Sequence, residues 1–194
     1  VSFPPIIFVM GGPGCGKETQ CKNMATKYGF CHVGLGQLLW QEAQQGTRRG
    51  QKIHDIMLQG LLVPTGVILD MISDHMLSCP DSQGFLIDGF PRELRQAKEF
   101  EHIPPSRVPG WAGPPTSSLC LTAPWRQWSR ESLRRRGQVE CRADDCKWAI
   151  RQRLEVRYTL CQPTLAFYQQ KNLLRKAAPE NIFAKCCSVI ESLQ

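Results

Sequence analysis

Residues 6–19 read Ile-Ile-Phe-Val-Met-Gly-Gly-Pro-Gly-Cys-Gly-Lys-Glu-Thr, and this stretch decides the fold class. An apolar run that stops at glycines is typical of a strand buried on both faces. The glycine-rich segment that follows contains the G-x-x-x-x-G-K pattern, from Gly11 to Lys17. Converging backbone N–H groups, the positive end of a helix and a lysine side chain together bind phosphate. The stretch therefore predicts a phosphate-binding loop between a strand and a helix.

Further strands and helices extend this pattern along the first half of the chain. Residues 84–88 are again mostly apolar and end in Asp88, at the position where an acid would hold Mg²⁺ or its waters. Helical spacing predicts helices at residues 17–27, 38–44, 51–58, 67–76 and 93–101. We interpret Gly36, Gly46 and Gly50 as breaks around the shorter helices. The alternation predicts an α/β fold with a P-loop NTPase-type parallel sheet of about five strands flanked by helices.

The second half of the chain is less regular. Residues 103–118 are rich in proline and glycine, which predicts an irregular loop. A weak strand is predicted at residues 119–121, and a last strand ends near residues 173–176. Helices are predicted at residues 127–136, 144–159, 163–170 and 180–193.

Composition limits the class of protein. The chain has 194 residues, of which 42% are hydrophobic and 21% charged, and this excludes a wholly disordered chain. Because we find neither an apolar run of roughly 18 residues nor a basic segment before the N-terminal apolar run, we expect no membrane span and no signal peptide. The net charge of +7 is uneven: residues 1–101 carry 9 cations and 10 anions, and residues 102–194 carry 15 and 7. The basic half indicates either an anionic partner or a solvated arginine-rich helix.

The chain has 10 cysteines, and no two of them have the C-x-x-C spacing. Cys141 and Cys146 are five positions apart and have no neighbouring histidine or cysteine that would complete a zinc site. We therefore expect reduced thiols in a cytoplasmic protein, with neither a disulfide nor a structural metal.

Four motifs stand in order along the chain. They are GGPGCGKETQ at residues 11–20, LVP at residues 62–64, GFLIDGFPR at residues 84–92 and RGQVECRADD at residues 136–145. In this order they resemble the adenylate kinases of the short-lid type, within the nucleoside monophosphate kinases. The resemblance covers almost the whole chain, apart from residues 102–132.

The resemblance implies reversible phosphoryl transfer from ATP to AMP, giving two ADP, with Mg²⁺ as the cofactor. The ATP-binding residues that it implies are Gly14, Cys15, Gly16, Lys17, Glu18, Thr19 and Arg136. The AMP-binding residues that it implies are Leu35, Trp40, Val63, Gly89, Phe90, Pro91, Arg92, Gln96, Arg142 and Arg153. Asp88, through water, and Thr19 would hold the Mg²⁺. The implied catalytic residues, which stabilise the charge of the transferring phosphoryl group, are Lys17, Arg92, Arg136, Arg142 and Arg153.

The resemblance also implies one nucleoside monophosphate kinase domain over residues 1–194. Its core would comprise residues 1–33, 64–134 and 146–194, with a nucleoside-monophosphate-binding insert at 34–63 and a short lid at 135–145. We expect a monomer whose partners are ATP, AMP and ADP, and which binds neither nucleic acid nor a membrane.

Two departures from the family pattern predict weakened activity. Glu18 stands where the family has glycine, and a like charge at about 5 Å from a phosphate costs roughly 3 kcal/mol at an effective dielectric near 20. Residues 34–40 read GLGQLLW where the family has S-T-G-[DE]-L-L-R. Trp40 thus replaces the arginine that clamps the AMP phosphate, and Leu35 replaces a threonine. The loss of one bidentate charged contact costs about 2–4 kcal/mol.

Three alternatives remain open. A UMP/CMP kinase-like enzyme would share the motifs, although Gln96, in the position that reads adenine, favours AMP. A degenerate, non-catalytic nucleotide-binding protein is supported by Glu18 and Trp40. A nucleic-acid-binding protein would use the tryptophans and arginines of residues 125–130 as a basic stacking surface.

Overall fold

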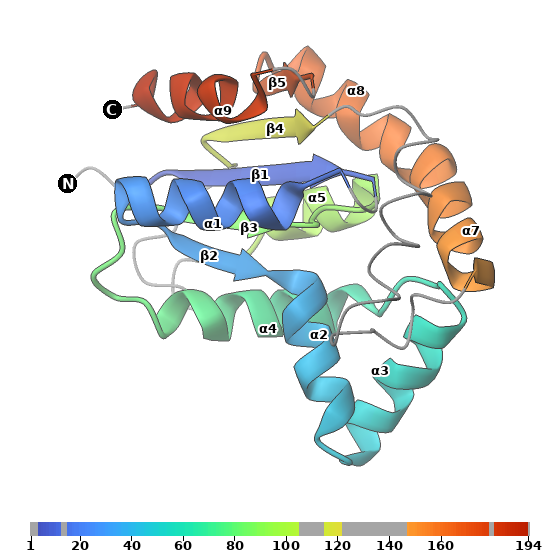
Figure 1. Ribbon diagram of the computed structural model, residues 1–194. Coiled ribbons are helices and arrows are strands. Elements are labelled where there is room, and N and C mark those ends of the chain that lie inside the picture. The colour runs from blue at the N-terminus through green and yellow to red at the C-terminus, as the bar shows by residue number, and fades with distance from the viewer. Residues whose placement is uncertain (1–3, 13–14, 105–114, 122–146, 179–180, 194) are drawn as a thin grey trace.

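Five parallel strands form one sheet in the order β2-β3-β1-β4-β5 (Figure 1). The computed structural model describes residues 4–12, 15–104, 115–121, 147–178 and 181–193. The strands are β1 (Ile6–Gly11), β2 (Cys31–Gly34), β3 (Phe85–Asp88), β4 (Ser117–Leu121) and β5 (Leu174–Ala177). The predicted α/β class and the parallel sheet of five strands are confirmed.

Helices cover both faces of this sheet. Their bounds are α1 (Lys17–Tyr28), α2 (Leu35–Gln44), α3 (Arg48–Leu58), α4 (Thr65–Leu77), α5 (Leu94–Glu101), α7 (Lys147–Val156), α8 (Gln162–Gln170) and α9 (Ile182–Glu191), with a π-helical turn at Arg157–Cys161. Buried side chains of α1 and α9 pack on one face, against Ile7 and Val9 of β1. Those of α4, α5 and α8 pack on the other face, against Ile6 and Phe8. Coverage of both faces explains why the central strand is apolar at every position.

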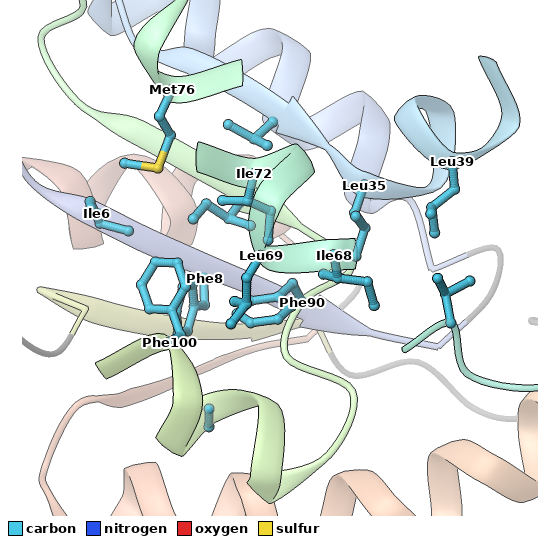
Figure 2. Packing of buried hydrophobic residues seen from close by; sticks show 14 of the residues in the cluster. Ile6, Phe8, Leu35, Leu39, Ile68, Leu69, Ile72, Met76, Phe90 and Phe100 are labelled. Atoms are coloured by element: carbon cyan, nitrogen blue, oxygen red, sulfur yellow. The ribbon is translucent and has the colours of Figure 1, made fainter. Parts of the chain in front are cut away.

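Phe8 lies at the centre of the larger cluster. Its ring centroid is 5.4 Å from that of Phe90, 4.9 Å from that of Phe100 and 5.9 Å from that of Tyr168. Figure 2 shows Phe8 beside Phe90 and Phe100, with the α4 side chains on the same face of the sheet. These edge-to-face contacts join β1 to α5, α8 and the loop after β3, so the core fixes the position of that loop.

Several predicted boundaries are wrong. Gly36 and Gly50 lie inside α2 and α3 and do not separate helices. Strand β4 begins at Ser117, so it includes the last two residues of the segment predicted as a loop. The predicted helix over residues 144–159 changes to π-helical geometry after Val156. The predicted helix over residues 127–136 lies outside the described residues.

Gly50 has a packing role that explains its place inside a helix. The N-cap Thr47 accepts a hydrogen bond from its backbone N–H at 2.9 Å, which starts α3. A Cβ atom at this position would lie 2.4 Å from the carbonyl oxygen of Glu42 in α2. The absence of a side chain therefore allows α2 and α3 to approach each other.

We expect the Gly50→Ala substitution to lower the free energy of unfolding by roughly 1–3 kcal/mol, because a Cβ atom there overpacks against backbone. Gly66 of α4 is the matched control, since a Cβ atom there would meet no atom within 4 Å. Gly66→Ala should stabilise the chain by about 0.4–1 kcal/mol. Thermal and denaturant unfolding of both variants measure the difference, and equal effects would contradict the packing role.

Candidate phosphoryl-transfer site

The loop after β1 holds the lysine that the sequence singled out. Lys17 is the first residue of α1, and Gly16 before it has a φ of 83°, a conformation that favours glycine. The Lys17 Nζ donates a hydrogen bond to the Gly12 carbonyl oxygen at 2.9 Å and lies 3.8 Å from the Sγ atom of Cys15. The ammonium group is therefore held at the loop, where the helix N-terminus also favours an anion. Pro13 and Gly14 lie outside the described residues.

Glu18 makes an ion pair along α1. Its Oε1 atom accepts a hydrogen bond from Lys22 Nζ at 2.9 Å, one helical turn further on. The side chain of Glu18 is 26% exposed, and Thr19 is exposed. The pair partly neutralises the carboxylate that the sequence places next to Lys17.

A buried acid follows the strand beside the loop. Asp88 ends β3, directly opposite Val9 of β1, and the next residue, Gly89, donates its N–H to the Val9 carbonyl at 3.0 Å. The Nε2 atom of His32, on β2, lies 3.3 Å from Asp88 Oδ2. Cys21 of α1 completes a group whose ligand atoms lie within 4.8 Å of one another.

The donors around Asp88 fit a hard divalent cation that is bound mainly by phosphate and water. Burial, and to a smaller extent the Asp88 carboxylate, raise the pKa of the Cys21 thiol, and sulfur is a soft ligand that does not suit a hard cation such as Mg²⁺. The carboxylate of Asp88 is then the oxygen donor of the group, and Mg²⁺ in nucleotide sites needs only one or two such carboxylates. Cys21 and His32 were missed by sequence analysis because only the folded sheet brings them to Asp88.

A cleft opens between the predicted insert and the core. Its empty volume, including space open to solvent, is about 490 Å³. Leu35, Gly36 and Leu39 of α2 line one side, and Val63, Ile68 and Arg92 are also among the lining residues. The predicted AMP-binding residues Leu35, Val63 and Arg92 thus lie around one cleft.

Hydrogen bonds fix Arg92 at this cleft. Its Nε donates to the Gly89 carbonyl at 3.2 Å, and its backbone N–H donates to Gln96 Oε1 at 2.8 Å. The Cys161 thiol donates to the Arg92 carbonyl at 3.0 Å. Gln96 is fully buried, and its Nε2 has no hydrogen-bond partner among the described residues. Since an unpaired buried donor costs about 1–3 kcal/mol, this amide is a candidate ligand contact.

The other predicted residues are placed less directly. Trp40 is half-buried on α2 and packs against the core; it is not one of the residues that line the cleft described above. Phe90 and Pro91 are buried, and Gly89 has a φ of 78°. Arg153 lies on α7. Arg136 and Arg142, with the whole predicted lid, lie outside the described residues.

The loop and the cleft open at one edge of the sheet. The loop follows β1, Asp88 ends the adjacent parallel strand β3 and Arg92 follows it, and both strands run in the same direction (Figure 1). Ligands of open α/β sheets bind at this carboxyl edge. A lysine-bearing phosphate loop, a neighbouring buried acid and an arginine-lined cleft on that edge define a nucleotide-binding protein of the P-loop class.

Comparisons with known proteins agree with this class. The family model described as adenylate kinase matches residues 9–173. The chain is 40% identical to adenylate kinase isoenzyme 1 of Homo sapiens and of Gallus gallus, over 97% of this chain and 95% of each relative. It is 39% identical to adenylate kinase isoenzyme 5 of Mus musculus, over 97% of this chain and 33% of that protein. The chain belongs to the adenylate kinase family and is a nucleoside monophosphate kinase.

No helix of the described part of the chain is long and apolar enough to cross a membrane.

Proposed function

We propose that this protein catalyses the reversible, Mg²⁺-dependent transfer of the ATP γ-phosphoryl group to AMP, giving two ADP. One observation carries the proposal: the Lys17 loop and the cleft of Arg92 follow adjacent parallel strands, β1 and β3, and open at the same sheet edge. A phosphate donor on the loop and an acceptor in the cleft would then meet over Asp88.

Each group has a distinct proposed role. The loop, from Gly14 through Thr19, binds the ATP phosphates, and Lys17 neutralises charge on the transferring group. Arg92 binds the acceptor phosphate, a contact that suits a planar guanidinium group. Asp88 and Thr19 would hold Mg²⁺, which would neutralise charge on the phosphates. Arg136, Arg142 and Arg153 would add cations when the lid of residues 135–145 and the insert of residues 34–63 close and exclude water.

The unpaired amide of Gln96 needs an acceptor that a nucleobase could supply, and the position of Gln96 in the family pattern, the one that reads adenine, favours AMP. Its Nε2 is a donor that needs an acceptor, and its Oε1 is occupied by the backbone N–H of Arg92. Ring nitrogens of adenine are acceptors of this kind. A UMP/CMP kinase-like activity is the second candidate, since both classes share the loop and the arginine.

A coupled assay of ADP formation from ATP and Mg²⁺, with AMP, CMP or UMP as the acceptor, tests the proposal. We expect AMP to give the highest kcat/KM. A higher value with CMP or UMP would replace the proposal by the second candidate. Calorimetry with a bisubstrate dinucleoside polyphosphate separates an inert binder, which binds it without turnover, from an enzyme.

We further propose that Glu18 and Trp40 weaken the activity, that the protein is a monomer and that it resides in the cytoplasm. Among the described residues, the buried cysteines Cys15, Cys21 and Cys186 are free thiols, which fits a reducing compartment.

Glu18 should weaken ATP binding, and its partner Lys22 should limit the effect. We expect the isosteric Glu18→Gln substitution to lower the KM for ATP by up to about tenfold, because it removes a like charge near the phosphates. Lys22→Met should raise this KM, since it leaves the carboxylate without the cation that lies 2.9 Å away. Initial rates at varied ATP concentration measure both values. Two shifts in the same direction would contradict an electrostatic role for Glu18.

A further inference from the structure

Three metal-ligating side chains meet at the far end of β2 from the phosphate site. Cys31 is the first residue of β2, His75 lies in the last turn of α4, and Cys79 follows that helix. One ligand atom from each, the two Sγ atoms and a ring nitrogen, lies within 4.8 Å of the other two. In the register of the sheet, Cys31 pairs with Phe85 at one end of β3, whereas Asp88 pairs with Gly34 at the other end.

The three residues of this cluster are too far apart in the sequence to form a recognisable metal-binding motif. His75 lies in the last turn of α4, and Cys79, four positions further on, lies just past the C-cap Ser78. The end of the helix thus brings both ligand atoms near the Cys31 thiol. The third ligand, Cys31, comes from a strand more than forty positions earlier in the sequence, so local motifs do not reveal it.

The backbone around the cluster is held in place. The Cys31 N–H donates to the Ser82 hydroxyl at 2.9 Å and to the Gly84 carbonyl at 2.8 Å. The Cys79 N–H donates to the Met76 carbonyl at 3.1 Å. These bonds hold Cys31 against the segment between α4 and β3, in which Cys79 also lies, and so limit the reorganisation that a ligand would require.

From these contacts we propose that Cys31, His75 and Cys79 form a binding site for a thiophilic divalent cation, with Zn²⁺ as the best match. Two thiolates and one imidazole suit zinc, which binds sulfur at about 2.3 Å and nitrogen at about 2.0 Å. Ligand atoms within 4.8 Å of one another need only small side-chain movements to reach one ion. Water fills the fourth position.

Cys31 is buried, whereas His75 and Cys79 are partly exposed, so the ion has a route from solvent. Burial, with the neighbouring Cys79, raises the pKa of the Cys31 thiol to about 12. The metal-free thiol is therefore protonated at neutral pH, and binding releases its proton.

The site would fix the base of the insert at residues 34–63. The insert begins where β2 ends and returns to the core just before α4. A metal that joins Cys31 to His75 and Cys79 links the two elements on which the insert is mounted. The cation would therefore stabilise the fold and not take part in phosphoryl transfer.

Cobalt binding to the reduced full-length chain tests the proposal. After dialysis against a chelator and a non-thiol reductant, Co²⁺ should give visible bands of a tetrahedral ion and a thiolate-to-cobalt charge-transfer band, saturating at one ion per chain. Loss of a group that hydrogen-bonds to a metal ligand already costs 10- to 100-fold in metal affinity, so Cys31→Ser, Cys79→Ser and His75→Gln, which remove ligands, should each lower the affinity by at least about 100-fold. Cys187→Ser and His54→Gln are matched controls outside the cluster and should leave the spectrum unchanged.

A second readout does not depend on cobalt. Zn²⁺ at a hundredfold excess over its Kd should raise the Tm of the wild-type chain by about 5–10 °C, and should leave the Tm of His75→Gln unchanged. The partial exposure of His75 makes this variant the one best able to fold. The proposal is overturned if the reduced chain binds no Co²⁺, or if the thiolate band survives in the doubly substituted Cys31→Ser, Cys79→Ser chain. It is also overturned if Cys31 and Cys79 are recovered as a disulfide that the reductant does not open.

Discussion

Lys17→Ala is expected to lower kcat for ADP formation by about 100- to 1000-fold, the usual effect of removing one preorganised donor from a developing negative charge. The ammonium group is held at the phosphate loop by the Gly12 carbonyl at 2.9 Å, so it needs little reorganisation to meet a phosphate oxygen. Initial rates at saturating ATP and AMP measure the loss. A large fall in kcat, with a smaller change in the KM for AMP, would place the lysine at the transferring group.

The matched control for this change is Lys185→Ala. Lys185 is an exposed lysine of α9, so its replacement alters the net charge equally without touching the loop. We expect wild-type rates and an unchanged Tm for this variant. A turnover of Lys17→Ala equal to that of the wild type would contradict catalysis at the loop, and activity in the preparation would then have another source.

The strands that carry this site could be predicted from the sequence where burial on both faces makes a strand apolar along its length. β1 and β3 are flanked by strands and covered by helices on both faces, so each appears as an apolar run before a glycine turn. β2 is an edge strand of four residues that includes the polar His32, and its burial alternates. Such a strand is defined by its pairing with β3, which no local pattern reports.

Glycine was the least reliable signal in the region of α2 and α3. Gly36 and Gly50 were predicted to break helices, but both are helical, and Gly50 lies against the Glu42 carbonyl. A glycine that permits close approach of two helices has the same local signature as one that ends a helix. Only the tertiary contact distinguishes the two cases.

The candidate site likewise contains residues that local motifs predict and a contact that only the folded chain creates. Lys17, Asp88 and Arg92 belong to contiguous motifs and were predicted from the sequence. The His32 contact with Asp88 joins residues 56 positions apart, and its partners depend on the strand order. The Glu18–Lys22 pair, in contrast, follows the i, i+4 spacing of a helix, so it could have been predicted from the sequence, although it was not. Predicting the environment of Glu18 therefore requires the charges of the helix that follows the phosphate loop as well as the loop motif itself.

Trp40→Arg is expected to lower the KM for AMP by about 30- to 1000-fold, the equivalent of one bidentate charged contact of 2–4 kcal/mol. Trp40 is one helical turn beyond Gly36, which lines the cleft of Arg92, so the two residues share a face of α2. A guanidinium group at this position would add a second cation for the AMP phosphate. The indole packs against the core, so the substitution should also lower the Tm by a few degrees.

Gln41→Arg is the control that separates geometry from charge. Gln41 is the next residue of α2 and is exposed, so an arginine at this position adds the same charge on a different part of the helix surface. Its KM for AMP should stay within about twofold of the wild-type value, because exposed charges are screened by solvent and salt. Equal gains from the two variants would show a general electrostatic effect. No gain from a folded Trp40→Arg chain would mean that Arg92 and the remaining arginines already bind the phosphate, and that position 40 does not limit the enzyme.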